Sequence, residues 1–328
     1  MIKKITGSFF ILLLIFSFSC EYLYSKDSSK LTKKQKKEHI ELAEIYFSSG
    51  VFSKALDEYN LLIKQKWPKK TYIDILSKKG LCHENLNQYD FAIETFQECI
   101  EVEPKNWKHH LNIARIYEKT SLNSQATIEY KKVIELNGDK FSAYYGLGRI
   151  YQSLGLNSQA IDNYKKALMI KSDASIYRRL SKCYETIRDW QLASEILKQA
   201  ISIEPNPEDY LHLALLYSLQ NKYDDVIEWL RVAGDKNPER LDIKFHLVAA
   251  YFKKNDYESA KNLLKVLKET NPEEPLVYFL SGFIYYFEGN ISSSKEEISK
   301  SCQLAKSPML KEYSKTFLSR IEEKLATK

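Results

Sequence analysis

A repeat with a period near 34 residues constrains this 328-residue chain more than any other feature of its sequence. Small residues recur at intervals of 33 to 37 residues, and two further series keep the same intervals. The first series is Ala43, Gly80, Ala114, Gly148, Ser181, Ala214, Val248 and Gly282. The second, mostly tyrosine, is Tyr46, His83, Tyr117, Tyr151, Tyr184, Tyr217, Tyr251 and Tyr285. The third, mostly alanine, is Ala55, Ala92, Ala126, Ala160, Ala193, Val226, Ala260 and Ser294. The chain is therefore expected to be an array of about eight copies of one structural unit.

The spacing of these series is that of a helical hairpin. Two antiparallel helices approach closely only where the crossing side chains are small. We therefore expect Gly148 on a first helix to face Ala160 on the second, with Tyr151 and Tyr164 filling the wider gaps. Each hairpin leaves one apolar face uncovered, so its stability has to come from stacking on neighbouring repeats. With only 10 glycines and 8 prolines, the composition also favours helices over sheets.

These motifs resemble the tetratricopeptide repeat (TPR), a helix-turn-helix unit of about 34 residues. Four prolines stand where that family ends its second helix: Pro104, Pro205, Pro238 and Pro272. The resemblance implies an all-α fold, a right-handed superhelical solenoid of about eight repeats over residues 38–308. A C-terminal capping helix is expected over residues 309–328, because apolar residues recur there at helical spacing. They are Leu310, Tyr313, Phe317, Ile321 and Leu325.

The N-terminal segment is typical of an export signal. Lysines precede an apolar stretch over residues 9–16, which is shorter than the roughly 20 residues of a transmembrane helix. We expect a signal peptide over residues 1–19. The pair Ser19-Cys20 resembles a bacterial lipobox, which implies lipidation of Cys20 and a tether over residues 20–37. The resemblance thus implies a lipid-anchored protein of the cell envelope that faces the periplasm; simple secretion or an uncleaved N-terminal anchor are the alternatives.

Four further cysteines occupy core-like helical positions: Cys82, Cys99, Cys183 and Cys302. Their spacing matches no zinc or Cys-x-x-Cys pattern, so buried thiols are expected. Cys82 and Cys99 are the one pair worth testing as a disulfide, because both fall in one predicted hairpin.

No catalytic constellation is present in the sequence, which has no His-Glu-x-x-His motif, phosphate-binding glycine-rich loop or nucleophile elbow. His109 and His110 are the closest pair of histidines, and adjacent helical residues point about 100° apart, so they are poorly placed to chelate one metal. The net charge of +6 does not indicate nucleic-acid binding. We expect no enzyme activity, cofactor, metal or small-molecule substrate.

The resemblance to TPR proteins implies that first-helix positions line a concave groove that binds protein partners. The basic part is expected at Arg115, Tyr145, Arg149, Arg178 and Lys182. The apolar part is expected at Leu211, Leu215, Phe245, Phe252, Phe279 and Phe283. For the basic residues, the alternative is pairing with Glu118 and Glu185. For the aromatic residues, the alternative is packing between repeats or against the C-terminal helix.

Two functions remain open at this point. The first is an envelope adaptor that holds a partner protein close to the membrane for assembly or secretion. The second is a periplasmic chaperone or receptor that captures extended peptide segments in the groove. TPR proteins that grip a C-terminal carboxylate use lysine and asparagine at groove positions that here hold residues such as Leu111, so a heat-shock co-chaperone is disfavoured.

Overall fold

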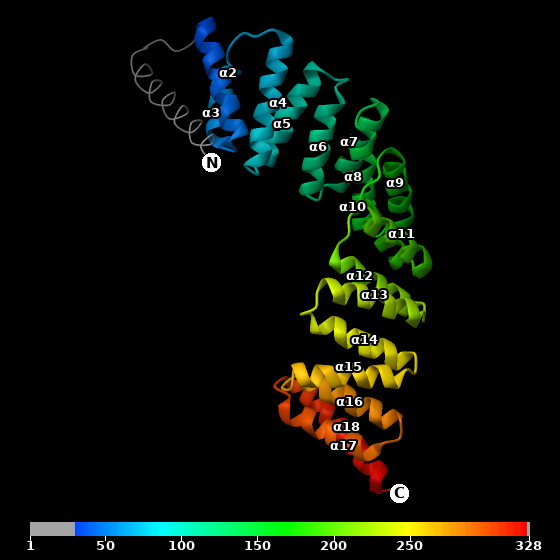
Figure 1. Ribbon diagram of the computed structural model, residues 1–328. Helices are drawn as coiled ribbons and strands as arrows, with labels where there is room; N and C mark the ends of the chain where they lie inside the picture. The colour runs from blue at the N-terminus through cyan, green and yellow to red at the C-terminus, as the bar shows by residue number, and fades with distance from the viewer. Residues whose placement is uncertain (1–29, 327–328) are drawn as a thin grey trace, which may run out of the picture. The chain divides into compact units, whose positions relative to one another are not determined.

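A computed structural model describes residues 30–326, in which 17 helices and no strands occur (Figure 1). The expected all-α solenoid of paired helices is confirmed. The first helices of the eight repeats are α2 (Lys33–Ser48), α4 (Lys69–Asn85), α6 (Trp107–Lys119), α8 (Lys140–Ser153), α10 (Ala174–Thr186), α12 (Pro207–Leu219), α14 (Leu241–Lys253) and α16 (Pro275–Phe287). The second helices are α3 (Phe52–Leu62), α5 (Tyr89–Val102), α7 (Asn123–Glu135), α9 (Asn157–Ile170), α11 (Trp190–Ile203), α13 (Tyr223–Lys236), α15 (Tyr257–Thr270) and α17 (Ile291–Leu304), and α18 (Pro308–Ala326) follows.

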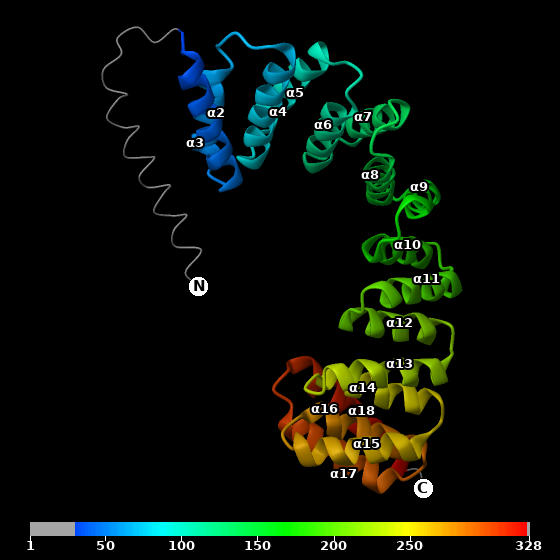
Figure 2. The ribbon, with the colours of Figure 1, turned by 45° about the horizontal axis from the view of Figure 1, so that its top comes forward.

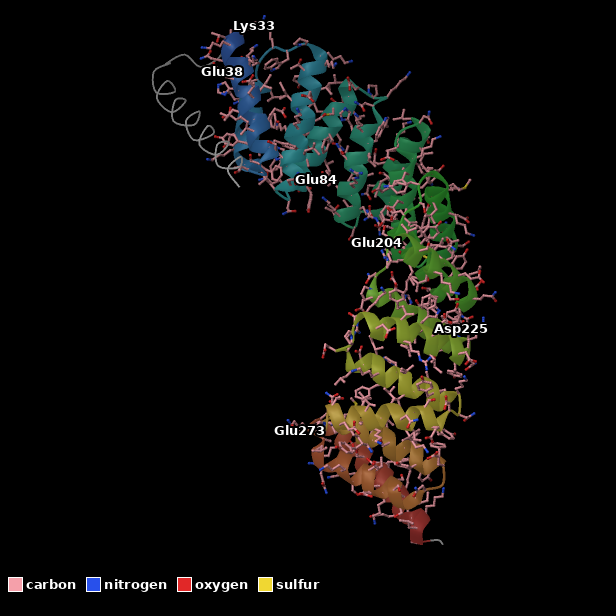
Figure 3. All side chains as sticks on the ribbon, viewed as in Figure 1. Lys33, Glu38, Glu84, Glu204, Asp225 and Glu273 are labelled. Atoms are coloured by element: carbon pink, nitrogen blue, oxygen red, sulfur yellow. The ribbon has the colours of Figure 1, made fainter. Side chains whose placement is uncertain are left out.

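The chain forms two compact units, Met1–Gly146 and Leu147–Lys328, called unit 1 and unit 2 below. Within each unit, helices that follow one another in the chain pack side by side (Figures 1 and 2). In unit 2, the turns inside the repeats and the turns between them lie at opposite edges. Figure 3 shows this with Asp225, in the first turn of α13, and Glu273, between α15 and α16.

The turn inside each repeat contains one residue in the left-handed conformation. These residues lie seven positions after the first sequence series: Gly50, Asn87, Ser121, Gly155, Arg188, Asn221, Asn255 and Gly289. The next backbone N–H then donates to the carbonyl of the second-series residue, for example Val51 to Tyr46 at 2.9 Å and Leu156 to Tyr151 at 2.9 Å. This is the hydrogen bond of a Schellman helix end, and it reverses the chain in a few residues.

A large buried side chain follows each small first-series residue at a fixed spacing. It lies sixteen positions later, on the second helix: Tyr59, Phe96, Tyr130, Tyr164, Leu197, Leu230, Leu264 and Ile298, all at most 3 % exposed. A Cβ atom at Gly148 would lie 2.5 Å from the ring of Tyr164. The prediction that Tyr164 fills the space at this crossing is confirmed, and the facing of Gly148 by Ala160 stays a prediction.

Two serines in the series also bond the two helices of a hairpin. The buried hydroxyl of Ser181 donates to the carbonyl of Ala193 at 2.7 Å, and that of Ser294 donates to Gly282 at 2.7 Å. Each hydroxyl thus finds a partner on the opposite helix, which offsets the cost of burying it. Ser294, which departs from the alanine pattern, is fully compatible with the repeat.

The helical array begins earlier than expected. Helix α2 starts at Lys33, not at residue 38, and Thr32 and Gln35 form a capping box at its N-terminus. Residues 33–37, which we assigned to the tether, therefore belong to the first repeat. The predicted signal peptide and Cys20 lie outside the described residues. Within residues 30–326, no helix has the length and apolar character needed to cross a membrane.

The C-terminal helix α18 confirms the expected cap, with a different contact stripe. Ile321 is fully buried with Ile291 and Ile298 of α17, and Phe317 packs at the edge of this cluster. Tyr313 and Leu325, expected on the buried face, are exposed. The stripe instead passes through Ser314, whose hydroxyl bonds that of Ser301 at 3.1 Å. Ser314, which has a buried hydrogen-bond partner, therefore occupies the buried face of α18 where the apolar pattern predicted Tyr313.

The four cysteines within residues 30–326 are free thiols, so the candidate disulfide between Cys82 and Cys99 is not formed. The two residues belong to different core clusters. Cys82 packs with Ala43 and Tyr59 of the first repeat, and Cys99 packs with Ile113 of the third. Burial raises the pKa of each thiol to about 12, so both are poorly reactive.

Candidate protein-binding groove

Two neighbouring hollows open on the first helices of unit 2, and together they are called the groove. The larger has a volume of about 580 Å³ and is lined by α10, α12, α13 and α14. The smaller has a volume of about 250 Å³ and is lined by α14 and α16. Ala249 and Lys253 of α14 line both, so the two hollows meet there.

The groove exists because one position in the repeat carries an unusually short side chain. The residue that follows each first-series residue points to the same face of successive first helices. In unit 2 this position holds Arg149, Lys182, Leu215, Ala249 and Phe283. Ala249 thus leaves a gap between Leu215 and Phe283. Val226 and Leu230 of the second helix α13 also line the larger hollow.

The lining is apolar around a small polar cluster at one end. The carboxylate of Glu185 accepts from Lys182 Nζ at 2.9 Å and contacts His212 Nε2 at 2.9 Å. Partial burial by itself raises the pKa of Glu185, but these two hydrogen bonds bring it below its usual range. Lys182 is therefore in the groove as expected, and it is paired with Glu185 as the alternative proposed.

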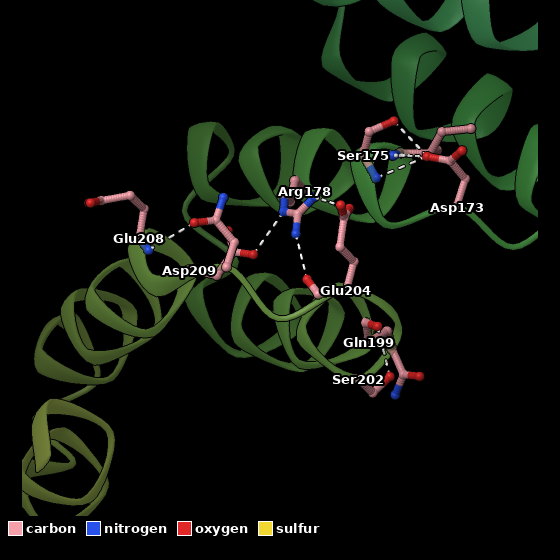
Figure 4. Close-up of polar contacts among 10 residues, drawn as sticks. Asp173, Ser175, Arg178, Gln199, Ser202, Glu204, Glu208 and Asp209 are labelled. Atoms are coloured by element: carbon pink, nitrogen blue, oxygen red, sulfur yellow. Dashed lines mark hydrogen bonds and ion pairs between the residues drawn. The ribbon is translucent and has the colours of Figure 1, made fainter. Parts of the chain in front are cut away.

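Arg178, one of the expected site residues, lines neither hollow and is engaged by neighbouring acidic groups. Its guanidinium donates to the buried carboxylate of Asp209 at 2.7 Å, to the Glu204 carboxylate at 3.1 Å and to the Glu204 carbonyl at 2.7 Å (Figure 4). These contacts join α10 to the segment that enters α12. Arg178 is committed to holding consecutive repeats together, since a buried carboxylate needs its counter-charge.

The aromatic residues of α14 and α16 form a continuous cluster with the C-terminal helix. Phe283 lies with its ring centre 5.2 Å from Phe252 and 5.6 Å from Phe317 of α18. Phe279 also contacts Phe317, at 6.1 Å. The alternative reading of this stretch, packing against the C-terminal helix, is thus correct for Phe279. Phe283 packs against α18 and also lines the smaller hollow, whereas Phe252 packs on Phe283 and lines the same hollow.

The remaining expected groove residues lie elsewhere. Arg115 and Tyr145 belong to unit 1, where Arg115 is exposed and Tyr145 stacks on Phe141 at 6.4 Å. Arg149 of α8 and Phe245 of α14 belong to unit 2 and line neither hollow. Alignment of Arg115 with Arg149 and Lys182 along one wall stays a prediction. Leu211 and Leu215 line the larger hollow as expected.

Comparison with known proteins agrees with this geometry. Models of the tetratricopeptide repeat match residues 73–106, 141–173 and 217–280. The chain contains tetratricopeptide repeats. The family models match one repeat in unit 1, the repeat that spans the boundary inside α8, and the part of unit 2 that forms most of the groove.

Solved TPR structures resemble the chain at low sequence identity. The C-terminal part of a TPR protein from Cytophaga hutchinsonii is 14 % identical with a TM-score of 0.55, covering 83 % of this chain and 98 % of that one. A structure of Naa15/Naa10 bound to HypK-THB is 13 % identical with a TM-score of 0.53, covering 85 % and 44 %. Both likenesses show the fold alone.

One curated relative matches a shorter stretch. The uncharacterized protein ycf37 of Cyanophora paradoxa is 26 % identical over 103 residues. That stretch is 31 % of this chain and 60 % of the relative, so this chain spans less than two thirds of the relative's length.

Three groove residues were not predicted from the repeat pattern. Ala249, Lys253 and His212 were not singled out, although Ala249 stands in the same series as Lys182 and Leu215. Ala249 differs from its equivalents in neighbouring repeats by having a much smaller side chain. A search for large side chains does not find such a residue, because it contributes to a hollow by leaving space empty.

Two histidines of the first helices pair with a glutamate of the same repeat. The Nδ1 atoms of His39 and His110 lie 2.7 Å from the carboxylates of Glu58 and Glu129, each nineteen residues later on the paired helix. Across residues 30–326, no three histidine, cysteine or acidic side chains cluster closely enough to hold a metal ion.

Proposed function

We propose that this chain is a TPR adaptor of the bacterial cell envelope that holds one or more partner proteins in the groove of unit 2. Lipidation of Cys20 tethers it to a membrane, and its partners are envelope proteins handled during assembly or secretion. Tetratricopeptide repeats mediate protein–protein interaction. The groove is the observation that supports the proposal most directly. Its lining exposes apolar side chains such as Leu215, which is 54 % exposed. Apolar surface gathered in a hollow is typical of a binding site.

The role proposed is binding without catalysis. The polar cluster in the groove consists of Lys182, Glu185 and His212, which pair with one another. Its carboxylate is held ionised by two cationic or hydrogen-bonding neighbours, which suits a fixed charge more than a proton carrier.

Pull-down with and without a crosslinker tests the proposal against the second candidate. An adaptor returns one stoichiometric partner in both conditions. A chaperone or receptor for extended segments returns many partners, and mainly after crosslinking. The second candidate is retained because an open, apolar groove could also hold an extended peptide segment. Leu215→Asp places a charge in the hollow and should abolish capture in either case.

Val266→Asp is the matched control. Val266 is also 54 % exposed, but it lies on the second helix α15 and outside both hollows. If Val266→Asp abolishes capture while Leu215→Asp does not, the second-helix face is the interface and the groove proposal is wrong.

The tether is tested separately from the groove. In the full-length protein, labelled fatty acid should be incorporated and the protein should partition into a detergent phase. Cys20→Ala should abolish both, because several acyl chains anchor a protein stably whereas an unlipidated chain lacks that anchor. A wild-type protein that stays in the aqueous phase and takes up no label would favour secretion.

A further inference from the structure

The gap at Ala249 has the size of a side chain that neighbouring repeats possess. The corresponding positions hold Leu215 and Phe283, and both side chains stand at the walls of the groove. Ala249 itself is exposed, so no side chain of residues 30–326 covers it. Apolar groups line the space on several sides, with Val226 and Leu230 below. The vacancy therefore suits one bulky apolar side chain supplied from outside.

The positive charge of Lys253 beside this gap favours an acidic neighbour for that side chain. His246 and Lys253 lie three residues before and four residues after Ala249, on the same face of α14. Both line the larger hollow, and neither forms an ion pair with any residue of the described range 30–326. The acidic groups of the lining are already engaged: Glu185 with Lys182 and His212, and Glu208 with Arg240 at 2.6 Å. The charge left for a partner is thus positive.

We infer that the groove recognises a partner segment in which a leucine or aromatic residue enters the gap at Ala249 and a neighbouring aspartate or glutamate pairs with Lys253. Ala249 and Lys253 are then the specificity-determining residues of the site. This inference rests on the proposed function and adds the chemistry of the partner. A hydrogen bond from Lys253 to the partner's carboxylate would be charge-assisted, and such bonds are stronger than those between neutral groups.

Selection of short random peptides displayed on phage against the immobilised full-length protein tests this inference. We expect the selected peptides to share a bulky apolar residue beside an acidic one. Labelled synthetic copies are then titrated against wild type, Ala249→Phe, Lys253→Glu and the control Val266→Phe. Ala249→Phe should weaken binding at least about tenfold, because the added ring occupies the gap. Val266→Phe, which adds the same ring on α15, should leave binding unchanged.

Two further readouts separate recognition from a general loss of structure. Lys253→Glu should bind the acidic peptide more weakly than wild type does. The same variant should bind well to a second peptide in which lysine replaces the acidic residue. The difference between wild type and Lys253→Glu should shrink at high salt, whereas the effect of Ala249→Phe should not. Unchanged helical content and thermal unfolding of Ala249→Phe show that the fold is kept.

Each other outcome overturns a distinct claim. Peptides that bind Ala249→Phe and Lys253→Glu normally but lose binding to Leu215→Asp contradict the inference and leave the groove in place. Peptides indifferent to all three variants, or no selected peptide at all, contradict the proposed function as well. Self-association of the wild type that Ala249→Phe abolishes would identify a second copy of this chain as the occupant, and the inference would be wrong.

Discussion

Single residues in the turns decide how sharply each repeat reverses, and they are not equally suited to it. The left-handed conformation is natural for glycine and accessible to asparagine, but it crowds the Cβ atom of other residues. Ser121 and Arg188 adopt it with φ values of 61° and 63°. These two turns therefore store backbone strain that the other six largely avoid.

Arg188→Gly should stabilise the protein by up to about 1 kcal/mol, since relief of strain outweighs the greater freedom of glycine in the unfolded chain. Denaturant unfolding followed by circular dichroism measures the change. Gly155→Ala, at the equivalent turn with φ of 72°, is the reverse control and should destabilise by a similar amount. A less stable Arg188→Gly would mean that the arginine side chain contributes more than its backbone costs.

His109 makes the stability of unit 1 dependent on pH. The ring is 3 % exposed, and burial lowers its pKa, although the Glu103 carboxylate at 3.7 Å acts in the opposite direction. The unfolded chain therefore binds a proton more readily than the folded one, so stability falls as pH drops through the unfolded histidine value of about 6.5.

His109→Leu should remove that part of the pH dependence, because leucine fills the site and cannot be protonated. Thermal unfolding of wild type and variant between about pH 8 and about pH 5 tests it. An equal fall in melting temperature for both proteins would show that other groups carry the acid sensitivity.

Helices and their crossings are the scale at which the sequence was most informative. The repeat indicates which residues cross, because a small side chain on one helix makes room for a large one on the other. It also indicates where the second helices end: Pro104, Pro205, Pro238 and Pro272 each lie two residues beyond one. The partner of a long polar side chain was not predictable. Arg178 occupies a groove-type position, yet it reaches Asp209 one repeat later, a contact that requires the actual approach of the two repeats.

Two glycines in helices should respond oppositely to alanine. At Gly148 the new methyl group would meet the ring of Tyr164 at 2.5 Å, so Gly148→Ala should destabilise by about 1–3 kcal/mol. At Gly234 of α13 the nearest atom would be Ile243 Cγ2 at 3.6 Å, an ordinary contact. Gly234→Ala should therefore stabilise by about 0.5–1 kcal/mol, the usual gain in a helix. Equal effects of the two changes in denaturant unfolding would show that the assigned crossing is wrong.

At the scale of the whole molecule, stability comes from local clusters that join consecutive helices. The cluster around Phe96 combines Cys99 with Ile113 of the next repeat, and the cluster around Ile298 combines Ile291 with Ile321 of the cap. The first-helix face carries little of this packing at Ala249 and Leu215, which leaves it available for a partner. The sequence predicted this face from family resemblance, but the hollow itself depends on which side chains fill it.

Binding of partners on the first-helix face of unit 2 can be measured directly. A photo-reactive phenylalanine analogue placed at Leu215 or at Val266 of the full-length protein tests it in living cells. Both positions are equally exposed, so chance collisions label both alike. We expect a discrete crosslinked partner from position 215, lost on Ala249→Phe, and none from position 266. Crosslinking from position 266 with none from position 215 would contradict this expectation.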